Sequence, residues 1–234
     1  INSGTTEYCT LLNFYKPDTL KLIQKSLGKE TIGFELIDQG KDHCIIKNVS
    51  GDLEDFDSVL RRTFLVLLQM AQESYESIKN RNYSHLINIA LLEESNNRFT
   101  TTCRRLINKK GYKNSNQPGP IYYIIEELEK IADEYKHLCN DVSKLNPNKH
   151  KVSKDVLEVF ENINHSLQLF YEVFYKFDEI KIVSIAEKRK YIVDRALKLF
   201  EKKNSIIDAI LLHHLTIIDQ NVFCLLGPYL VMAL

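Results

Sequence analysis

The chain of 234 residues has only eight glycines and five prolines. This scarcity argues against a turn-rich all-β fold and is compatible with long, uninterrupted helices. The chain also lacks net charge, because 31 basic residues balance 31 acidic ones. Since binding to a phosphate backbone needs a basic excess, the balance excludes a general polyanion binder.

Closely spaced cysteine pairs are missing as well. The five cysteines, an odd number, are scattered without CxxC spacing, which argues against a disulfide framework and against a zinc ribbon. We therefore expect a reducing, cytoplasmic location. Cys103 falls on the inward face of a predicted helix, where we expect an inert structural thiol.

No long hydrophobic run is present. The longest, Val222–Leu234, has 13 residues and contains Gly227 and Pro228, whereas a membrane span needs about 20 residues. We therefore expect no membrane span. A signal peptide is not visible, and because the chain begins at Ile1 we expect a fragment or a processed form.

Common catalytic motifs are absent too. The sequence contains no GxxxxGK(S/T) phosphate loop, no GxGxxG turn after a strand, no GxSxG elbow and no HExxH helix. We therefore expect that the protein is not an enzyme.

The hydrophobic pattern changes near residue 52. Before it, short β-favouring runs at 7–14, 32–37 and 44–49, with a helix from about residue 17 to 27, predict a small α/β segment over residues 1–51. After it, apolar residues recur with the helical period of 3.6. Helices are expected at about 53–78, 83–108, 121–138, 154–178, 182–203 and 205–226, with Ser153 as an N-cap.

Six helices in two groups of three predict a mostly α, six-helix bundle of two three-helix repeats, residues 52–148 and 149–234. A shift of 87 residues places Leu128 on Leu215 and Ile131 on Ile218, and a shift of 94 places Arg104 on Lys198. These matches are mostly apolar, as they would be for many pairs of amphipathic helices. The order of the helices and the basic end of the second helix favour a duplication.

The segments Phe56–Met70 (FDSVLRRTFLVLLQM) and Leu128–Asp133 (LEKIAD), together with the two-by-three helix order, resemble the PhoU family of phosphate-uptake regulators, in its archaeal form. Residues 33–37 (GFELI) look like the linker domain of archaeal members, and the resemblance covers residues 33–226. It implies a non-enzymatic regulator of phosphate homeostasis that binds a phosphate-transporter ATPase subunit or a phosphate-signalling protein. It also implies a possible homodimer, and an N-terminal SpoVT-AbrB-type DNA-binding domain that this chain lacks.

The same resemblance implies metal ligands. Members of the family carry an E/D-x-x-x-D signature that holds iron or zinc, and carboxylates at i and i+4 share one helix face. Glu129 and Asp133 match it in the first repeat, but Thr216 and Gln220 replace them in the second. The candidate ligands on the preceding helix are Glu93, Glu94 and Asn97. The alternative is that the acidic residues between 126 and 134 form the solvated face of an amphipathic helix.

The histidines carry little signal. His213 and His214 are adjacent, so they point about 100° apart on a helix and do not easily face one metal. We expect a core-lining or capping role for them. The remaining histidines are isolated in the sequence.

Basic residues suggest a partner or anion surface. Arg104, Arg105, Lys109 and Lys110 lie in a run without acidic residues, which either complements a helix C-terminus or faces an anionic partner or phosphate. Arg61 and Arg62 interrupt an otherwise apolar helix and either pair with carboxylates of the third helix or face a partner.

Three functional hypotheses follow. The first is the PhoU-like regulator that acts through a partner. The second is a phosphate-responsive transcriptional regulator whose DNA-binding domain is missing from this chain. The third is a metal-binding helical bundle centred on Glu129 and Asp133, and a helical scaffold of unknown partner is the remaining alternative.

Overall fold

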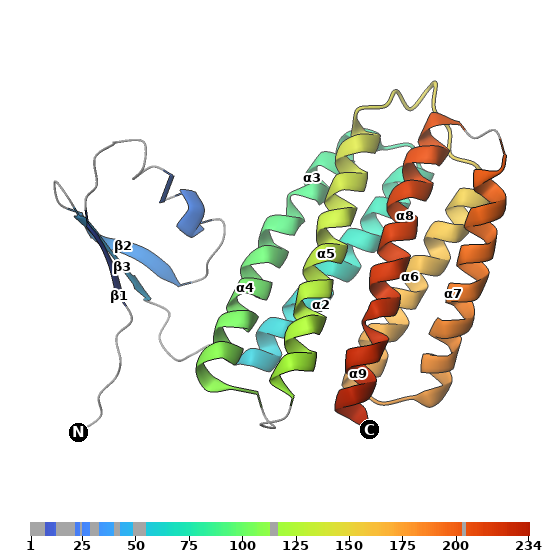
Figure 1. Cartoon of the computed structure of the whole chain (residues 1–234). Helices are drawn as coiled ribbons and strands as arrows, with labels where there is room; N and C mark the ends of the chain where they lie inside the picture. The colour runs from blue at the N-terminus through green and yellow to red at the C-terminus, as the bar shows by residue number, and fades with distance from the viewer. Residues whose placement is uncertain are drawn as a thin grey trace.

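The computed structural model describes residues 8–12, 22–23, 25–28, 33–39, 43–48, 55–112, 117–202 and 205–234. Over these residues the protein is mostly helical, and a long helical bundle lies beside a small sheet (Figure 1). The prediction of a mostly α bundle preceded by a segment with strands is confirmed at this level.

The sheet has three short antiparallel strands. They are β1 (Tyr8–Leu12), β2 (Phe34–Gln39) and β3 (His43–Asn48), in the order β1-β3-β2. The three predicted strands are confirmed, although β2 continues two residues beyond the predicted end, past a register irregularity between Leu36 and Asp38. Residues 22–23 and 25–27 of the predicted helix are helical, as is Gly28 just after it, and the rest of that helix lies outside the described residues.

The bundle follows the predicted helix order. Its elements are α2 (Phe56–Lys79), η1 (Tyr83–His85), α3 (Leu86–Ala90), α4 (Leu92–Lys110), α5 (Pro118–Ser143), α6 (Lys154–Tyr175), α7 (Glu179–Phe200), α8 (Ile206–Cys224) and α9 (Leu226–Ala233). The second predicted helix is broken into η1, α3 and α4. The last one, expected to end near residue 226, ends at Cys224, and the helix α9 that follows it was not predicted. The break after Cys224 has a clear cause, because the ring of Pro228 clashes with a carbonyl four residues earlier and proline has no N–H to donate.

Side-chain caps fix where three of the helices begin. The Ser153 hydroxyl accepts a hydrogen bond from the Val156 N–H, as predicted, and Ser205 caps α8 in the same way through the Asp208 N–H. The Asp178 carboxylate caps α7. Asp208 also accepts a 2.9 Å hydrogen bond from the Ser153 N–H, which ties the start of α6 to the start of α8.

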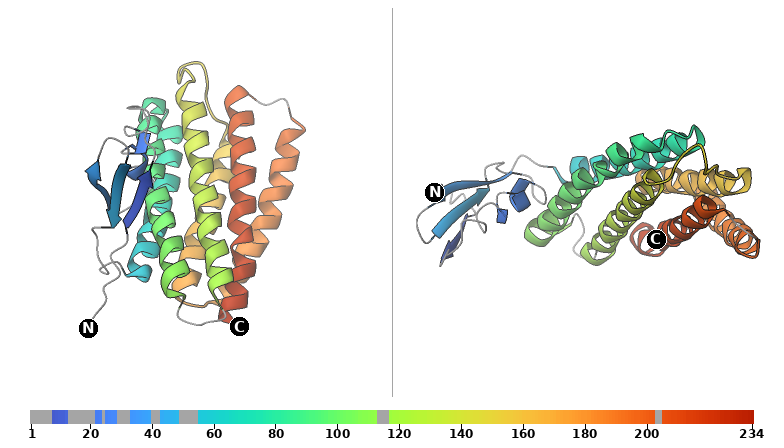
Figure 2. Two further views of the ribbon diagram at one scale, coloured as in Figure 1. Left: turned by 60° about the vertical axis from the view of Figure 1, so that its left-hand side comes forward. Right: turned by 90° about the horizontal axis from the view of Figure 1, so that it is seen from above.

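The helices pack as two sets of three that lie side by side. Helices α2, α4 and α5 contact one another, as do α6, α7 and α8, and the two sets meet where α5 packs on α8 and α2 packs on α6. Viewed from above, α4, α5, α8 and α7 follow one another on one side of the bundle, with α2 and α6 behind them (Figure 2).

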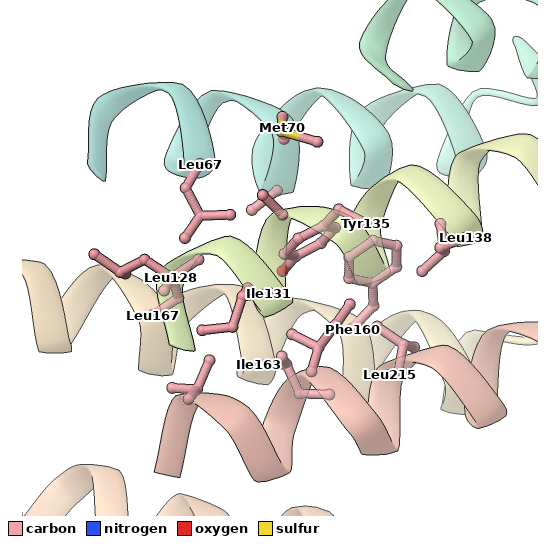
Figure 3. Packing of buried hydrophobic residues seen from close by; sticks show 14 of the residues in the cluster. Leu67, Met70, Leu128, Ile131, Tyr135, Leu138, Phe160, Ile163, Leu167 and Leu215 are labelled. Atoms are coloured by element: carbon pink, nitrogen blue, oxygen red, sulfur yellow. The ribbon is translucent and has the colours of Figure 1, made fainter. Parts of the chain in front are cut away.

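The core runs through both sets of helices. Figure 3 shows its central part, in which α5 lies between α2, α6 and α8. Every residue labelled there is fully buried: Leu67, Met70, Leu128, Ile131, Tyr135, Leu138, Phe160, Ile163, Leu167 and Leu215. The Tyr135 hydroxyl donates to Asn164 Oδ1 at 2.7 Å, and Asn164 Nδ2 donates to the Ala71 carbonyl at 2.7 Å. This chain of hydrogen bonds satisfies polar groups that would otherwise destabilise the core.

One stretch, Ile206–Ala233, is long and apolar enough by length and composition to cross a membrane. Half of its most apolar window is buried within the bundle. It is weak evidence for a span, because core helices of soluble proteins meet the same criterion. The uninterrupted apolar run at 222–234 is shorter than this stretch, because the stretch also contains polar residues and is apolar only on average.

Candidate metal and ion-pair sites along α5

Helix α5 carries two rows of polar side chains, and each row faces a different neighbouring helix. Glu126, Glu129, Asp133 and Lys136 are spaced by three, four and three residues, which places them on one face, toward α4. The side chains of a second row, at 134 and 141, lie seven residues apart and face α8. The two rows therefore form separate sites.

The first site is centred on Arg104 of α4. Its guanidinium lies 2.6 Å from Glu126 Oε1 and 2.5 Å from Glu129 Oε2, and the Thr100 hydroxyl donates to the same Glu129 oxygen at 3.0 Å. Burial would lower the pKa of Arg104, but the hydrogen bonds to Glu126 and Glu129 outweigh it and raise that pKa. Arg104 is thus held as a cation between two helices.

Lys136 continues this row of ion pairs between α4 and α5, which we call the α4–α5 ladder. Its Nζ lies 2.9 Å from Glu93 Oε1 and 2.5 Å from Asp133 Oδ1, and Asn97 also donates to Glu93. Glu93 is only 4% exposed, so its charge depends on these partners. Burial opposes the charge of Lys136, but its hydrogen bonds to Asp133 and Glu93 raise its pKa overall.

The structure thus brings together most of the carboxylates that the sequence suggested as metal ligands. Glu129 is paired with Arg104, and Asp133 and Glu93 are both paired with Lys136. Glu94 is half-buried in the first turn of α4. Two cations of the chain already neutralise these groups, and a metal ion at Glu129 and Asp133 stays a prediction.

The alternative of a fully solvated acidic face does not describe α5. Glu127 is buried at 2% exposure, with Lys130 Nζ 2.6 Å from its Oε1, and the other acidic residues between 126 and 134 are partly buried. Glu126, Glu129 and Glu134 instead link α5 to its neighbours through charge-assisted hydrogen bonds, whereas Glu127 and Asp133 pair with lysines of α5 itself.

The second row meets two histidines of α8. His214 Nδ1 lies 2.6 Å from Glu134 Oε1, and its Nε2 lies 3.4 Å from Asp141 Oδ2. His214 is 6% exposed, whereas His213 is exposed, and their ring centroids are 5.1 Å apart. One ligand atom from each of Glu134, His213 and His214 lies within 4.8 Å of the others, so this group can hold a metal ion.

This group differs from the sequence-based expectation for the histidines. The Cα–Cβ bonds of His213 and His214 point about 100° apart around the helix axis. The imidazole side chains are nevertheless long enough for ring atoms of both to approach Glu134. The expected core-lining role agrees with the burial of His214 but not with the exposure of His213. The adjacent His213 and His214, and the seven-residue spacing of Glu134 and Asp141, could be read from the sequence. The packing of α5 against α8, which brings them together, could not.

Asp141 links this site to solvent. Its carboxylate accepts a 2.8 Å hydrogen bond from Lys144 Nζ and is about half exposed. That hydrogen bond is the main cause of its lowered pKa; burial acts in the opposite direction, and His214 contributes further lowering. Asp141 therefore presents an ionised carboxylate to the His214 ring.

The predicted basic surface is not continuous. Arg104 points between helices, and the Arg105 guanidinium lies over the Phe34 ring, 4.7 Å from its centroid. Lys109 and Lys110 are exposed in the last turn of α4, where cations complement the helix dipole. Arg104 is thus largely buried in ion pairs with α5, and an anion or partner surface formed by the other basic residues stays a prediction.

The other two predicted surface residues, Arg61 and Arg62, are both exposed on α2. Across the described part of the chain, neither forms an ion pair with a carboxylate of α5 or of any other helix. The expected pairing with carboxylates of the third helix is thus not seen among the described residues, and a partner-facing role for this pair stays a prediction.

Comparison with known proteins gives no relative: no family model, no curated protein and no solved structure matches the chain.

Proposed function

We propose that the protein is a non-enzymatic, PhoU-like cytoplasmic regulator of phosphate uptake that acts by binding a phosphate-transporter ATPase subunit or a phosphate-signalling protein. The observation that supports it is the packing of six long helices as two sets of three, each set with mutual contacts. This is the arrangement that the resemblance leads us to expect.

The two sets are proposed to be repeats, residues 52–148 and 149–234. Shifting α5 by 87 residues aligns it with α8, and the matched pairs Leu128 with Leu215 and Ile131 with Ile218 are all fully buried. The polar positions do not match, since Thr216 and Gln220 stand opposite Glu129 and Asp133. The second copy would therefore keep the packing residues and lose the carboxylates.

Regulation by such a bundle needs no chemistry. A partner that exists in two conformations shifts toward the one that the bundle binds better. The exposed Arg61 and Arg62 on α2 are the surface that we assign to an acidic partner, and a homodimer is part of the same proposal.

The test is an affinity pull-down from the native host, grown with excess and with limiting phosphate, followed by mass spectrometry. We expect recovery of a transporter ATPase or phosphate-signalling component that changes with phosphate. The double variant R61E/R62E should lose it, whereas K149E/K151E, which alters two exposed cations at the opposite end of the bundle, should keep it. Wild-type protein that recovers no such component under either condition would overturn the proposal.

Metal binding is a second candidate function, and the Glu134–His213–His214 group is the observation that favours it. We propose zinc or iron as the ion, because two imidazoles and one carboxylate suit borderline divalent metals. Metal analysis of protein purified without chelators tests this function, and metal-free protein that fails to take up either ion would exclude it.

A further inference from the structure

The Glu134–His213–His214 group joins two helices that belong to different sets. Glu134 comes from α5, which packs with α2 and α4, whereas His213 and His214 come from α8, which packs with α6 and α7. An ion bound here would therefore have ligands from both halves of the bundle.

The spacing of the group is close to what a zinc ion requires. With ligand bonds of about 2.0–2.1 Å, neighbouring ligand atoms of a tetrahedral site lie about 3.3 Å apart. The His214–Glu134 pair at 2.6 Å would open slightly, and the remaining separations, at most 4.8 Å, would need to change by no more than about 1.5 Å if they are longer than this. His213 is exposed and can rotate to make this change without disturbing the core.

A second observation points to the same ligand. Zinc-bound histidines usually donate the N–H of their other ring nitrogen to a carboxylate, which fixes the ring and its tautomer. When His214 Nδ1 faces Glu134, its Nε2 faces Asp141 Oδ2 at 3.4 Å. Asp141 thus has the position of the supporting carboxylate, and it is held there by Lys144.

We propose that Zn²⁺, held by Glu134, His213 and His214 with Asp141 supporting His214, clamps α5 to α8 and so couples the two halves of the bundle. This inference rests on the metal-binding function proposed above. Three protein ligands leave a fourth position for water or for a partner's side chain. Zinc would in this way set the rigidity of a surface on which partners dock.

Three measurements on the full chain separate binding from clamping. Calorimetric titration with ZnCl₂ into chelator-stripped protein measures the stoichiometry, and amide hydrogen exchange measures protection of α5 and α8 with zinc and with EDTA. Thermal unfolding with and without zinc measures Tm. We expect one zinc per chain, slower exchange at residues 131–142 and 207–218, and a rise in Tm of roughly 5–10 °C at a hundred-fold excess over Kd.

The rise in Tm of each variant is measured against its own zinc-free protein. H213A removes an exposed ligand, and E134Q keeps a hydrogen-bonding side chain beside His214; both should lose zinc binding and the rise in Tm. H165A removes an exposed histidine of α6 and should behave like the wild type. MgCl₂ should have no effect, because Mg²⁺ prefers an octahedron of oxygen ligands.

Each outcome decides a separate point. Wild-type protein that binds no zinc overturns both the metal-binding function and the clamp. Zinc binding that survives in H213A overturns this site. Binding that is lost in H213A and E134Q, but that leaves exchange in α5 and α8 unchanged in the wild type, overturns the clamp alone.

Discussion

Replacing Lys136 with methionine tests whether the α4–α5 ladder is a structural ion-pair network. Lys136 is a main partner of Glu93, whose carboxylate is 4% exposed, at a distance of 2.9 Å. Methionine has a similar length and no charge, so K136M leaves a buried carboxylate to which, among the described residues, Asn97 is the remaining donor. Asp133, the other partner of Lys136, is 41% exposed and can be solvated instead.

The expected loss of unfolding free energy follows from this burial. Removing one partner of a fully buried ion pair costs about 3–5 kcal/mol. Because the Lys136 side chain is a quarter exposed, water can partly replace it, and we expect about 2–3 kcal/mol. This is a large share of the 5–15 kcal/mol by which a typical protein is stable.

Urea unfolding of the wild type, K136M, E93Q and the double variant measures the coupling. E93Q removes the charge that needs Lys136, so the double variant should cost only about 1 kcal/mol, less than K136M alone, and the coupling energy should be at least about 1 kcal/mol. K144M is the matched control, because Lys144 forms an i,i+3 pair with the half-exposed Asp141, as Lys136 does with Asp133. It should cost about 0.5 kcal/mol or less. Additive losses in the double variant, or a K136M loss no larger than that of K144M, would refute the reasoning.

Three further outcomes are expected. Burial raises the pKa of Asp219 to about 6, against the opposing effect of Arg189. The folded state therefore keeps a proton that the unfolded chain has released, and the unfolding free energy should fall by up to about 3 kcal/mol as pH rises from about 4 to 6. The difference between wild type and D219N, measured by urea unfolding across this range, should show that slope, and a flat difference contradicts it. Phe160→Ala should cost about 3–5 kcal/mol in the same assay, because the ring is fully buried against Tyr75 and Tyr135; a loss below 1 kcal/mol would mean that the site collapses. Ser153→Ala should cost about 1 kcal/mol through loss of the α6 cap, and Ser153→Thr, which keeps the hydroxyl, should cost less.

The helices themselves were determined by local sequence. The 3.6-residue recurrence of apolar side chains placed every long helix to within a few residues, and Ser153 marked the start of α6, because these signals act between near neighbours in the chain. The three strands were equally visible, as short β-favouring runs.

The points at which helices are interrupted were harder to predict. Residue 91 interrupts the second predicted helix without a proline, and periodicity continues across such a break. The second break, after Cys224, lies four residues before Pro228, and the sequence contained its cause.

The partners of charged side chains were decided only by the tertiary structure. The i,i+4 spacing of Glu129 and Asp133 is the same for metal ligands, for a solvated face and for an ion-pair ladder, and only the approach of Arg104 and Lys136 distinguishes the ladder. His214 likewise gained its carboxylates from a helix 80 residues earlier. Periodicity specifies which face of a helix is buried, but the energies of many helix pairings are similar, and the pairing that forms depends on how the whole core fills space.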